Sequence, residues 1–364
     1  MIRIICTCGA RPNFMKIAPI MREFERNGNF ETLLIHTGQH YDENMSRQFF
    51  EELEIPKPNI NLEVGSGSHA FQTAEIMKSF EPVVLNFQPD YVLVVGDVNS
   101  TIACAMVAVK LGVKLIHIEA GLRSFDRTMP EEINRILTDS ISDLLFVTEQ
   151  AAINNLKREG VDPANIYFVG NVMIDALRAN LANAKKSTIL SKLQLEPKKY
   201  AVVTVHRPSN VDDMHKFGEI ISAFEIIVKD IKLVFPIHPR TRNNIKDNEL
   251  GIRIEKMFHL LLINPVGYLD FLCLMNNAAL VMTDSGGIQE ETTILGIPCM
   301  TLRQNTERPV TLTNGTNCLV NTSTEDILKK YHKILTDNSK NNSKFPKLWD
   351  GKAAERIVKI IASQ

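Results

Sequence analysis

Residues 91–111 read YVLVVGDVNSTIACAMVAVKL: a short apolar run, a polar turn and a longer apolar stretch, in that order. The opening run, Tyr91–Val95, is short, apolar and rich in valine, which is typical of a strand buried on both faces. From Thr101 to Leu111, apolar residues recur at three- and four-residue spacing, which predicts a helix. A buried strand followed by a glycine turn and a helix predicts a parallel sheet covered by helices.

The same alternation continues through the first half of the chain. Short runs rich in Val and Ile predict strands at Arg3–Thr7, Thr32–His36, Tyr91–Val95, Lys114–Ile118, Leu144–Val147 and Ile166–Val169. Stretches of helical period predict helices at Asp42–Leu53, His69–Phe87, Thr101–Leu111, Glu131–Ser140 and Glu149–Glu159. We therefore expect the first half to form one domain with a parallel sheet.

A change of composition marks a domain boundary. From Asn180 to Lys199 the chain is polar and rich in lysine, and the strand pattern restarts at Tyr200. The second half predicts strands at Ala201–Val205, Leu233–Ile237, Leu260–Ile263, Leu280–Thr283 and Pro298–Leu302. The predicted fold class is α/β, with two doubly wound, Rossmann-like domains and a cleft between them. The expected division is residues 1–180, residues 181–350, and a C-terminal helix over residues 351–364 that packs back on the N-terminal domain.

Composition narrows the classes of function. The 364 residues carry a formal net charge of −1, with 44% hydrophobic and 23% charged residues, which is typical of a soluble globular protein. A near-neutral chain without a basic run predicts neither a nucleic-acid partner nor a membrane partner, so we expect a small-molecule ligand. No signal peptide or membrane span is evident, which favours a cytoplasmic location. The six cysteines lack metal-ligand spacing, so we expect them in the core and predict no metal site.

Ligands of doubly wound sheets bind beyond the carboxyl ends of the strands, so the polar residues there are candidates for function. After the first strand, Gly9–Lys16 reads GARPNFMK, with Arg11 and Lys16 in the first turns of a helix. Cations at a helix N-terminus oppose the helix dipole, whereas a bound anion would explain them. We prefer this anion site to the alternative of a solvated surface pair.

Three carboxylates follow strands of the first half. Asp97 and Glu119 each come directly after a strand, and Glu131 begins the next helix, where it can pair with Arg135 one turn later. A single such acid is often a helix cap, which is the alternative role of Asp97. Three acids that converge on one cleft indicate acid/base chemistry, because crowding separates the pKa values of neighbouring carboxylates.

The second half offers histidines and a glycine turn. His206 and His238 each follow a strand, and histidine titrates near neutral pH, although a lone histidine is more often structural. The stretch Thr283–Glu291 reads TDSGGIQEE, a strand that runs into a Ser-Gly-Gly turn and a helix. Its amides are suited to an anion, Glu291 is suited to ribose hydroxyls, and Arg308 adds a cation downstream.

The chain resembles the non-hydrolysing UDP-N-acetylglucosamine 2-epimerase family. The resemblance rests on motifs that occur in order: GARPNFMK, VGDVNST, HIEAGLR, PEEINR, GNVMIDAL, HRPSNVDD, DSGGIQEE and NTERP, with WDGKAAERI near the C-terminus. It implies the GT-B architecture, UDP held mainly by the C-terminal domain, and no nicotinamide or other cofactor. It also implies elimination of UDP to 2-acetamidoglucal, re-addition to give UDP-N-acetylmannosamine, and a homodimer.

The resemblance also implies roles for individual residues. Asp97, Glu119 and Glu131 would be the acid/base groups, with His206 close to the leaving phosphate. The remaining residues implied to bind substrate are Arg11, Lys16, Arg135, Val266, Phe271, Ser285, Gly286, Gly287, Glu291 and Arg308. Phe271 would lie beside uracil, where Val266 replaces a glutamine of bacterial members and can offer only its backbone.

One further site belongs to bacterial members of the family. They bind a second substrate molecule as an activator, close to residues that match Gln39 and His238. The stretch Gly65–Ser68 lacks the arginine expected there, which argues against activation.

The residues leave three other functions open. A hydrolysing epimerase would release UDP, and a GT-B glycosyltransferase would need an acceptor site. A nucleotide-sugar sensor would bind its ligand without turnover.

Overall fold

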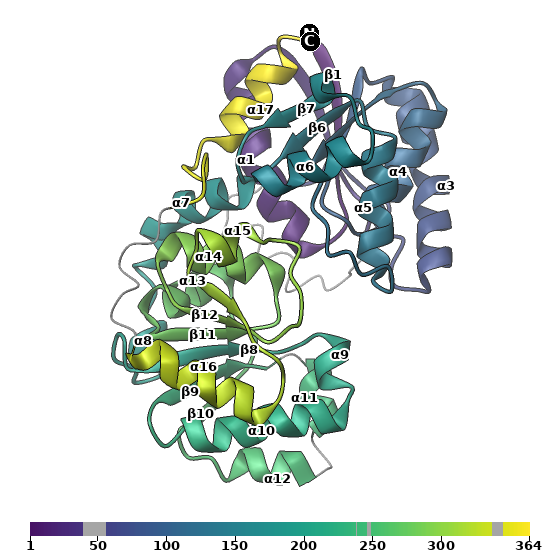
Figure 1. Cartoon of the computed structure of the whole chain (residues 1–364). Coiled ribbons are helices and arrows are strands. Elements are labelled where there is room, and N and C mark those ends of the chain that lie inside the picture. Colours follow the sequence, from purple (N-terminus) through teal and green to yellow (C-terminus); the bar gives the residue numbers. More distant parts are fainter. Residues whose placement is uncertain (39–55, 238, 246–248, 337–344) are drawn as a thin grey trace. The chain divides into compact units, whose positions relative to one another are not determined.

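The computed structural model describes residues 1–38, 56–237, 239–245, 249–336 and 345–364. The chain divides into two compact units: unit 1 is Met1–Ala179 with Lys347–Gln364, and unit 2 is Asn180–Pro346. Each unit has its own sheet with helices packed around it (Figure 1). The expected fold class, α/β of GT-B type with two parallel-sheet domains, is confirmed. The helix predicted at Asp42–Leu53 lies outside the described residues.

The sheet of unit 1 is parallel throughout and has the strand order β3-β2-β1-β4-β5-β6-β7. The strands are β1 (Ile2–Cys8), β2 (Phe30–His36), β3 (Ile60–Asn61), β4 (Tyr91–Val95), β5 (Lys114–Ile118), β6 (Leu144–Val147) and β7 (Ile166–Phe168). The chain moves outward from β1 to β3 and then returns to β4. The order therefore reverses between β1 and β4, and the loops after these two strands are where such a fold binds ligands.

The helices that carry unit 1 residues are α1 (Arg11–Asn27), α3 (His69–Phe87), α4 (Asn99–Lys110), α5 (Pro130–Ser140), α6 (Gln150–Arg158), the 3-10 helix η1 (Pro163–Asn165), α7 (Val172–Ala184) and α17 (Ala353–Ile361). All five residues of β4 are buried, as expected for a strand covered on both faces. Val92 and Val94 pack with Ile76 and Phe80 of α3, whereas Leu145 and other β6 residues pack against α6.

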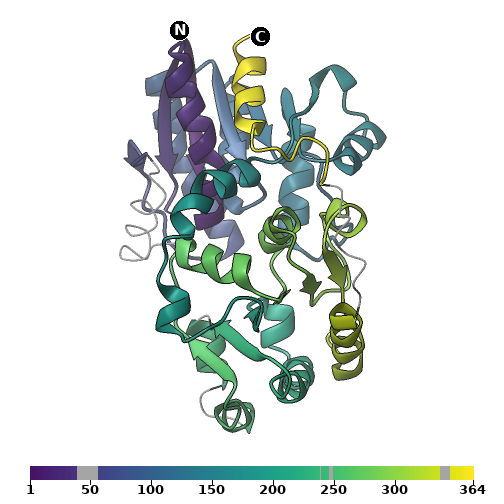
Figure 2. The same cartoon turned by 90° about the vertical axis from the view of Figure 1, so that its left-hand side faces the viewer.

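The C-terminal segment returns to unit 1, where α17 packs against α1 (Figures 1 and 2). Two contacts fix the entry to α17. The carboxylate of Asp175 accepts hydrogen bonds from the backbone amides of Ala353 (3.2 Å) and Ala354 (2.9 Å). Trp349 donates its indole N–H to the carbonyl of Thr148, at 2.9 Å.

Unit 2 contains a second parallel sheet with the strand order β10-β9-β8-β11-β12-β13. The strands are β8 (Tyr200–Thr204), β9 (Lys232–Pro236), β10 (Leu260–Ile263), β11 (Leu280–Thr283), β12 (Cys299–Thr301) and β13 (Asn317–Leu319). The helices are α8 (Ile189–Lys192), α9 (Pro208–Val211), α10 (Met214–Ile227), α11 (Pro239–Ile245), α12 (Glu249–Glu255), α13 (Tyr268–Asn277), α14 (Gly286–Leu295), α15 (Val310–Thr313) and α16 (Thr324–Thr336). The order reverses between β8 and β11, so the loops after these strands hold the corresponding ligand position.

The predicted strands agree with the observed ones to within one or two residues, but β3 and β13 were not predicted. Both are very short edge strands, and β3 pairs through only two residues. The expectation that the cysteines lie in the core is confirmed, since all six are unbridged and only Cys318 is partly exposed.

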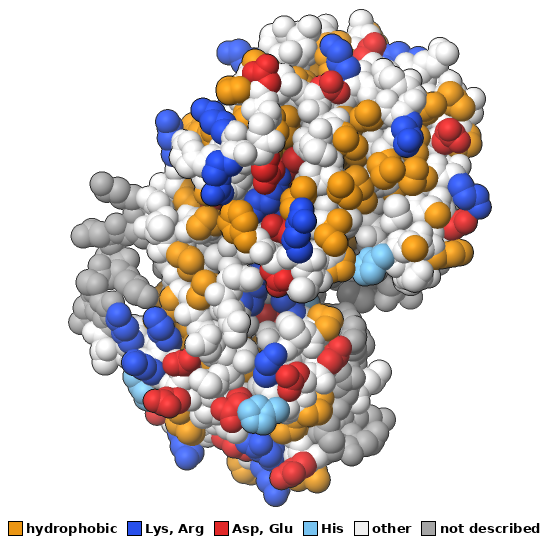
Figure 3. Space-filling view, turned by 45° about the vertical axis from the view of Figure 1, so that its right-hand side comes forward, with side chains coloured by type: hydrophobic (Ala, Val, Ile, Leu, Met, Phe, Trp, Pro, Cys, Tyr) orange, Lys and Arg blue, Asp and Glu red, His pale blue; other side chains and the backbone are white. Residues whose placement is uncertain are grey.

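The surface of unit 1 carries exposed apolar side chains over α3 and α5 (Figure 3). Phe71 and Leu85 of α3 are 55% and 56% exposed, and Ile133 and Leu137 of α5 are 46% and 48% exposed. Among the described residues, no helix combines the length and the apolar character that spanning a membrane requires.

Candidate functional site

The loops after β1 and β4 are tied together by Asn13. Its side-chain oxygen accepts hydrogen bonds from the amides of Gly9 (3.3 Å) and Ala10 (2.9 Å), while its amide nitrogen donates to the carbonyl of Val95 (3.0 Å). Asn13 is 2% exposed, so these bonds are shielded from water. The side chain thereby fixes the start of α1 against the end of β4, at the switch point of the sheet.

Lys16 and Glu119 form a buried ion pair beside this loop. The ammonium of Lys16 contacts Oε2 of Glu119, and the two side chains are 10% and 2% exposed. Glu119 has a φ of 71°, a left-handed conformation that residues other than glycine seldom adopt. Gly96 lies beside the pair and has a φ of 71°, a conformation that favours glycine. The anion that Lys16 faces in this structure is therefore a carboxylate.

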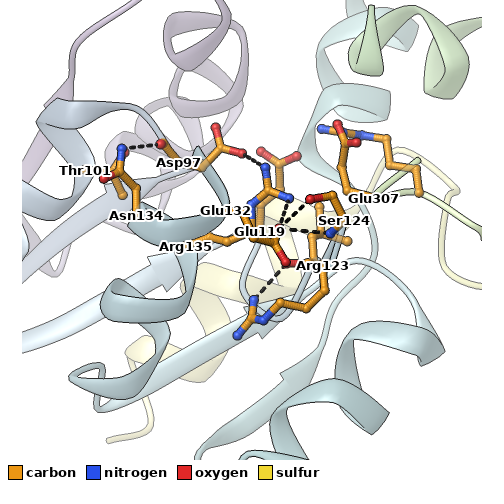
Figure 4. A network of polar contacts seen from close by, with 12 residues as sticks. Asp97, Thr101, Glu119, Arg123, Ser124, Glu132, Asn134, Arg135 and Glu307 are labelled. Carbon is orange, nitrogen blue, oxygen red and sulfur yellow. Dashed lines mark hydrogen bonds and ion pairs between the residues drawn. The ribbon is translucent and has the colours of Figure 1, made fainter. Parts of the chain in front are cut away.

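Asp97 belongs to a second network, which α5 organises (Figure 4). Nη2 of Arg135 lies 2.5 Å from Oδ2 of Asp97, and its Nη1 lies 3.0 Å from Oε2 of Glu132. Glu132 in turn accepts hydrogen bonds from the amide and hydroxyl of Ser124 and from the amide of Phe125. The side chain of Asp97 remains 34% exposed, so it is held in place but open to a ligand.

Two sequence-based interpretations of this region are wrong. The pairing of Glu131 with Arg135 does not form, because Arg135 instead bridges Glu132 and Asp97. Glu131 lies exposed in the first turn of α5. The alternative role of Asp97 as a helix cap is also excluded, because the N-cap residue of α4 is Val98.

In unit 2, His206 and Asp284 join the loops after β8 and β11. Nδ1 of His206 lies 3.0 Å from Oδ1 of Asp284, and the amides of His206 and Arg207 donate to the same carboxylate. Burial raises the pKa of Asp284, but the bonds and charge from His206 outweigh burial and hold that pKa below its ordinary value. The imidazole of His206 is 49% exposed, so an ionised acid orients a histidine that solvent can reach.

The Ser-Gly-Gly turn lies next to a buried charge network. Ser285 is the N-cap residue of α14, and Gly286 and Gly287 are its first residues. Arg308 contacts Glu290 (Nε to Oε1, 2.6 Å) and Glu307 (Nη1 to Oε1, 2.5 Å). A Cβ at Gly286 would lie 2.6 Å from Nη1 of Arg308, so only glycine lets the guanidinium approach the helix N-terminus this closely. A cation and backbone amides thus meet at one point, which is suited to an anion.

Glu291 is buried one turn into α14 and accepts a hydrogen bond from the hydroxyl of Tyr268, at 2.7 Å. Burial raises the pKa of Glu291 to about 7, and neighbouring Glu290 acts in the same direction, whereas the Tyr268 hydroxyl opposes them. Phe271 lies in the first turn of α13, and Val266 lies in the loop that precedes this helix. Both are partly exposed.

Three of the predicted site residues fall wholly or partly outside the described part of the chain. Gln39 and His238 lie outside the described residues, and Arg11 begins α1 with a side chain that is likewise not described. Among the described residues, no group of three or more His, Cys, Asp or Glu side chains is arranged to hold a metal ion.

Sequence reasoning missed the residues that hold the candidates in place. These include Asn13, His117, Glu132, Asp139, Tyr268, Asp284, Glu290 and Glu307. Several of them lie within motifs that the sequence analysis quoted, but their role depends on partners distant in the chain. Asp284 is 78 residues from His206, for example.

Comparison with known proteins places the chain in a family. A sequence model described as UDP-N-acetylglucosamine 2-epimerase matches residues 22–362. The chain is 47% identical over 362 residues to a UDP-N-acetylglucosamine 2-epimerase homolog of Methanococcus maripaludis, and the match covers 99% of both proteins. It is 40% identical over 364 residues to a UDP-2,3-diacetamido-2,3-dideoxy-D-glucuronate 2-epimerase of Pseudomonas aeruginosa, again covering 99% of both.

A solved structure is similar over the whole length. The crystal structure of Methanocaldococcus jannaschii UDP-GlcNAc 2-epimerase in complex with UDP-GlcNAc and UDP has a TM-score of 0.91 and 43% identity to this chain, and covers 100% of both chains. A match across nearly all residues, at this identity and with the same two-sheet architecture, settles the classification. The chain belongs to the UDP-N-acetylglucosamine 2-epimerase family.

Proposed function

We propose that the chain is a non-hydrolysing epimerase that interconverts UDP-N-acetylglucosamine and UDP-N-acetylmannosamine. One observation carries the proposal: Asp97 and Glu119 follow the adjacent strands β4 and β5, each with its own cationic partner. Charge-paired carboxylates at neighbouring strand ends are suited to proton transfer at a bound ligand. The solved relative that binds UDP-GlcNAc and UDP supports the choice of substrate.

The proposed reaction is an elimination followed by an addition. A carboxylate removes the proton from C2, the C1–O bond breaks, and UDP leaves with the bonding electrons to give 2-acetamidoglucal. In the second half, an acid returns a proton to the other face of C2, and a phosphate oxygen of UDP re-forms the C1–O bond. Asp97, Glu119 and Glu131 are the proposed acid/base groups. His206, oriented by Asp284, is proposed to stabilise the leaving phosphate.

Unit 2 is proposed to hold the nucleotide. The amides at Ser285, Gly286 and Gly287 would bind the diphosphate together with Arg308, because a helix N-terminus and a guanidinium both favour phosphate oxygens. Glu291 would accept from ribose hydroxyls, and Phe271 and the backbone at Val266 would contact uracil. Arg11, Lys16 and Arg135 are proposed to contact the substrate from unit 1.

The deciding experiment follows UDP-N-acetylglucosamine by NMR in deuterated water. We expect deuterium at C2 of both sugar nucleotides and a mixture of the gluco and manno forms, because proton exchange accompanies inversion. Free UDP that accumulates in proportion to consumed substrate would instead establish the hydrolysing reaction. Binding without exchange would leave only a sensor.

A second substrate is favoured by one relative. The P. aeruginosa protein that is 40% identical is named for UDP-2,3-diacetamido-2,3-dideoxy-D-glucuronate, a sugar with a second acetamido group and a carboxylate. The same NMR assay with both sugar nucleotides in competition measures the ratio of their kcat/KM values. A ratio that favours the uronate would overturn the proposed substrate and leave the reaction type intact.

The remaining expectations stay predictions. A homodimer is consistent with the apolar side chains exposed on α3 and α5, because contiguous apolar surface often marks an interface. The molecular mass in solution decides between monomer and dimer. The cytoplasmic location and the allosteric role of Gln39 and His238 likewise stay predictions.

A further inference from the structure

Asp139 contacts residues on both sides of Glu119: the side chain of His117 and the backbone of Gly121. Its carboxylate, 2% exposed in α5, accepts a hydrogen bond from Nδ1 of His117 (2.6 Å) and from the amide of Gly121 (3.0 Å). His117 lies two residues before Glu119, and Gly121 lies two residues after it. A single carboxylate therefore clamps the segment in which Glu119 adopts its left-handed conformation.

His117 extends the same contact to the loop that carries Asp97. Its Nε2 lies 2.8 Å from the carbonyl oxygen of Gly96, the residue before Asp97. A carbonyl can only accept, so Nε2 is the donor in this bond. His117 is fully buried, so both of its hydrogen bonds are shielded from water. Asp139 and His117 thus connect one helix to the backbone beside both candidate acids.

Asp139 is itself held from the opposite side. Nη1 of Arg123 lies 2.7 Å from its Oδ2, and the guanidinium of Arg123 pairs further with Glu159. Burial raises the pKa of Asp139, but His117 and Arg123 outweigh burial and keep that pKa below its ordinary value. The carboxylate is therefore a fixed acceptor. A left-handed non-glycine residue persists only where its surroundings determine its conformation, and these bonds supply that constraint.

We propose that Asp139 is a positioning residue that sets, through His117 and Gly121, the relative placement of Asp97 and Glu119. The inference rests on the proposed function, since it concerns the distance between two acid/base groups. Asp139 takes no proton from substrate. Its effect is geometric, and a displacement of about 1 Å at a reacting group can lower the rate about 10²-fold.

The test is Asp139→Asn. The asparagine keeps the size of the side chain, but it has one accepting oxygen in place of two and no charge, so His117, Gly121 and Arg123 can no longer all donate to it and the clamp weakens. We expect kcat for C2 exchange to fall about 10²-fold while the Kd of UDP, bound by unit 2, changes less than about twofold.

A second readout is independent of how much enzyme is active. The glucal intermediate either returns to substrate or proceeds to product, depending on where the two acids stand. We expect the ratio of deuterium in recovered substrate to deuterium in product to shift by at least about threefold in Asp139→Asn. A merely destabilised enzyme would keep the wild-type ratio, and that result would overturn the proposal.

Asp175→Asn is the matched control. Asp175 is also a buried carboxylate of unit 1 that accepts from two backbone amides, but these belong to the start of α17. We expect it to lower the melting temperature and to leave the deuterium ratio unchanged. A shift in the control equal to that in Asp139→Asn would refute a specific role for Asp139.

His117→Gln provides a second route should Asp139→Asn not fold. Its single amide cannot span from Asp139 to Gly96, so the same shift in the deuterium ratio is expected. When both variants fold, the variant with both substitutions should be no slower than the slower single variant, because both substitutions break the same chain of hydrogen bonds. Losses of rate that add up in the double variant would contradict this shared chain. If the wild-type enzyme shows no C2 exchange at all, it is the proposed function that fails.

Discussion

Asp139 in unit 1 and Glu291 in unit 2 are both buried acids on helices that follow a strand, yet their pKa values move in opposite directions. Burial raises both. Asp139 faces His117 and Arg123, whose charges more than offset burial, so its pKa falls below its ordinary value. Glu291 has a tyrosine hydroxyl and a neighbouring carboxylate instead, and its pKa rises to about 7.

The difference shows that the two buried carboxylates, Asp139 and Glu291, have different roles. Asp139 is matched by cations and serves as a fixed acceptor that holds the Gly121 amide and the Arg123 guanidinium. In unit 2, Glu291 can be neutral near pH 7 and can then donate as well as accept. We infer that Asp139 in unit 1 serves a fixed geometry and that Glu291 in unit 2 serves a hydrogen-bonding ligand. The predictions below test that division.

The largest effect is expected from Asp97→Asn. Removal of an acid/base group lowers the rate about 10²- to 10⁴-fold, while Arg135 keeps its contact with Glu132 and preserves the loop. The Kd of UDP should stay within about twofold, since unit 2 is the proposed nucleotide-binding half. Steady-state kinetics and calorimetry measure both quantities.

Asp126→Asn is its control. The side chain of this unit 1 aspartate accepts hydrogen bonds from the amide and the hydroxyl of Thr128, at an exposed turn. It should retain wild-type kcat. If Asp97→Asn lost UDP affinity by as large a factor as it lost rate, the proposed division of roles between the units would be contradicted.

The second effect is a pH dependence of stability in unit 2. The folded-state pKa of Glu291 lies above its unfolded value, so its contribution is full below about pH 4.5 and is lost as pH rises through about 7. A rise from 4.5 to about 7 corresponds to about 3 kcal/mol. Opening free energies of α14 amides, from hydrogen exchange at several pH values, should therefore fall with pH in the wild type.

Glu291→Gln should remove this dependence, because glutamine is neutral at every pH. Asp139, with its lowered pKa, contributes stability above the unfolded value and loses it only on acidification. A fall of the α14 opening free energies between about pH 5 and 7 that persists in Glu291→Gln would contradict this origin of the pH dependence.

The smallest effect is expected from Gly286→Ala. The new methyl group would lie 2.6 Å from Nη1 of Arg308 and 2.8 Å from Oε1 of Glu307, so the guanidinium must move away from the helix N-terminus. Loss of one charge-assisted hydrogen bond should weaken UDP binding about tenfold. Gly218→Ala in α10 is the control, since its Cβ would meet only Leu250 at 3.8 Å. Equal weakening by both variants would contradict a specific contact at Arg308.

The fold could be predicted because strands buried on both faces appear as apolar runs, as in Tyr91–Val95 and Leu280–Thr283. The edge strands β3 and β13 could not, because they are two and three residues long and each contains an asparagine. No periodicity is visible over so few residues.

The candidate site, like the fold, could be predicted only in part. Asp97, Glu119 and Ser285 could be selected from the sequence because they directly follow strands, and topology places strand ends at ligands. Their partners could not, because contacts such as His117 with Asp139 depend on how a strand and a helix pack. The expected pair of Glu131 and Arg135 failed for this reason, since a partner outside the helix, Asp97, competed for the arginine.

The return of residues 347–364 to unit 1 has a consequence for synthesis on the ribosome. Residues 180–346 form unit 2 from one continuous stretch, so all of unit 2 is translated before α17. Unit 1 begins first but lacks the helix that covers α1 until translation reaches Ile361. The half of the protein that is translated earliest is therefore the last to be finished, and until then an apolar strip of its first helix is open to chaperones.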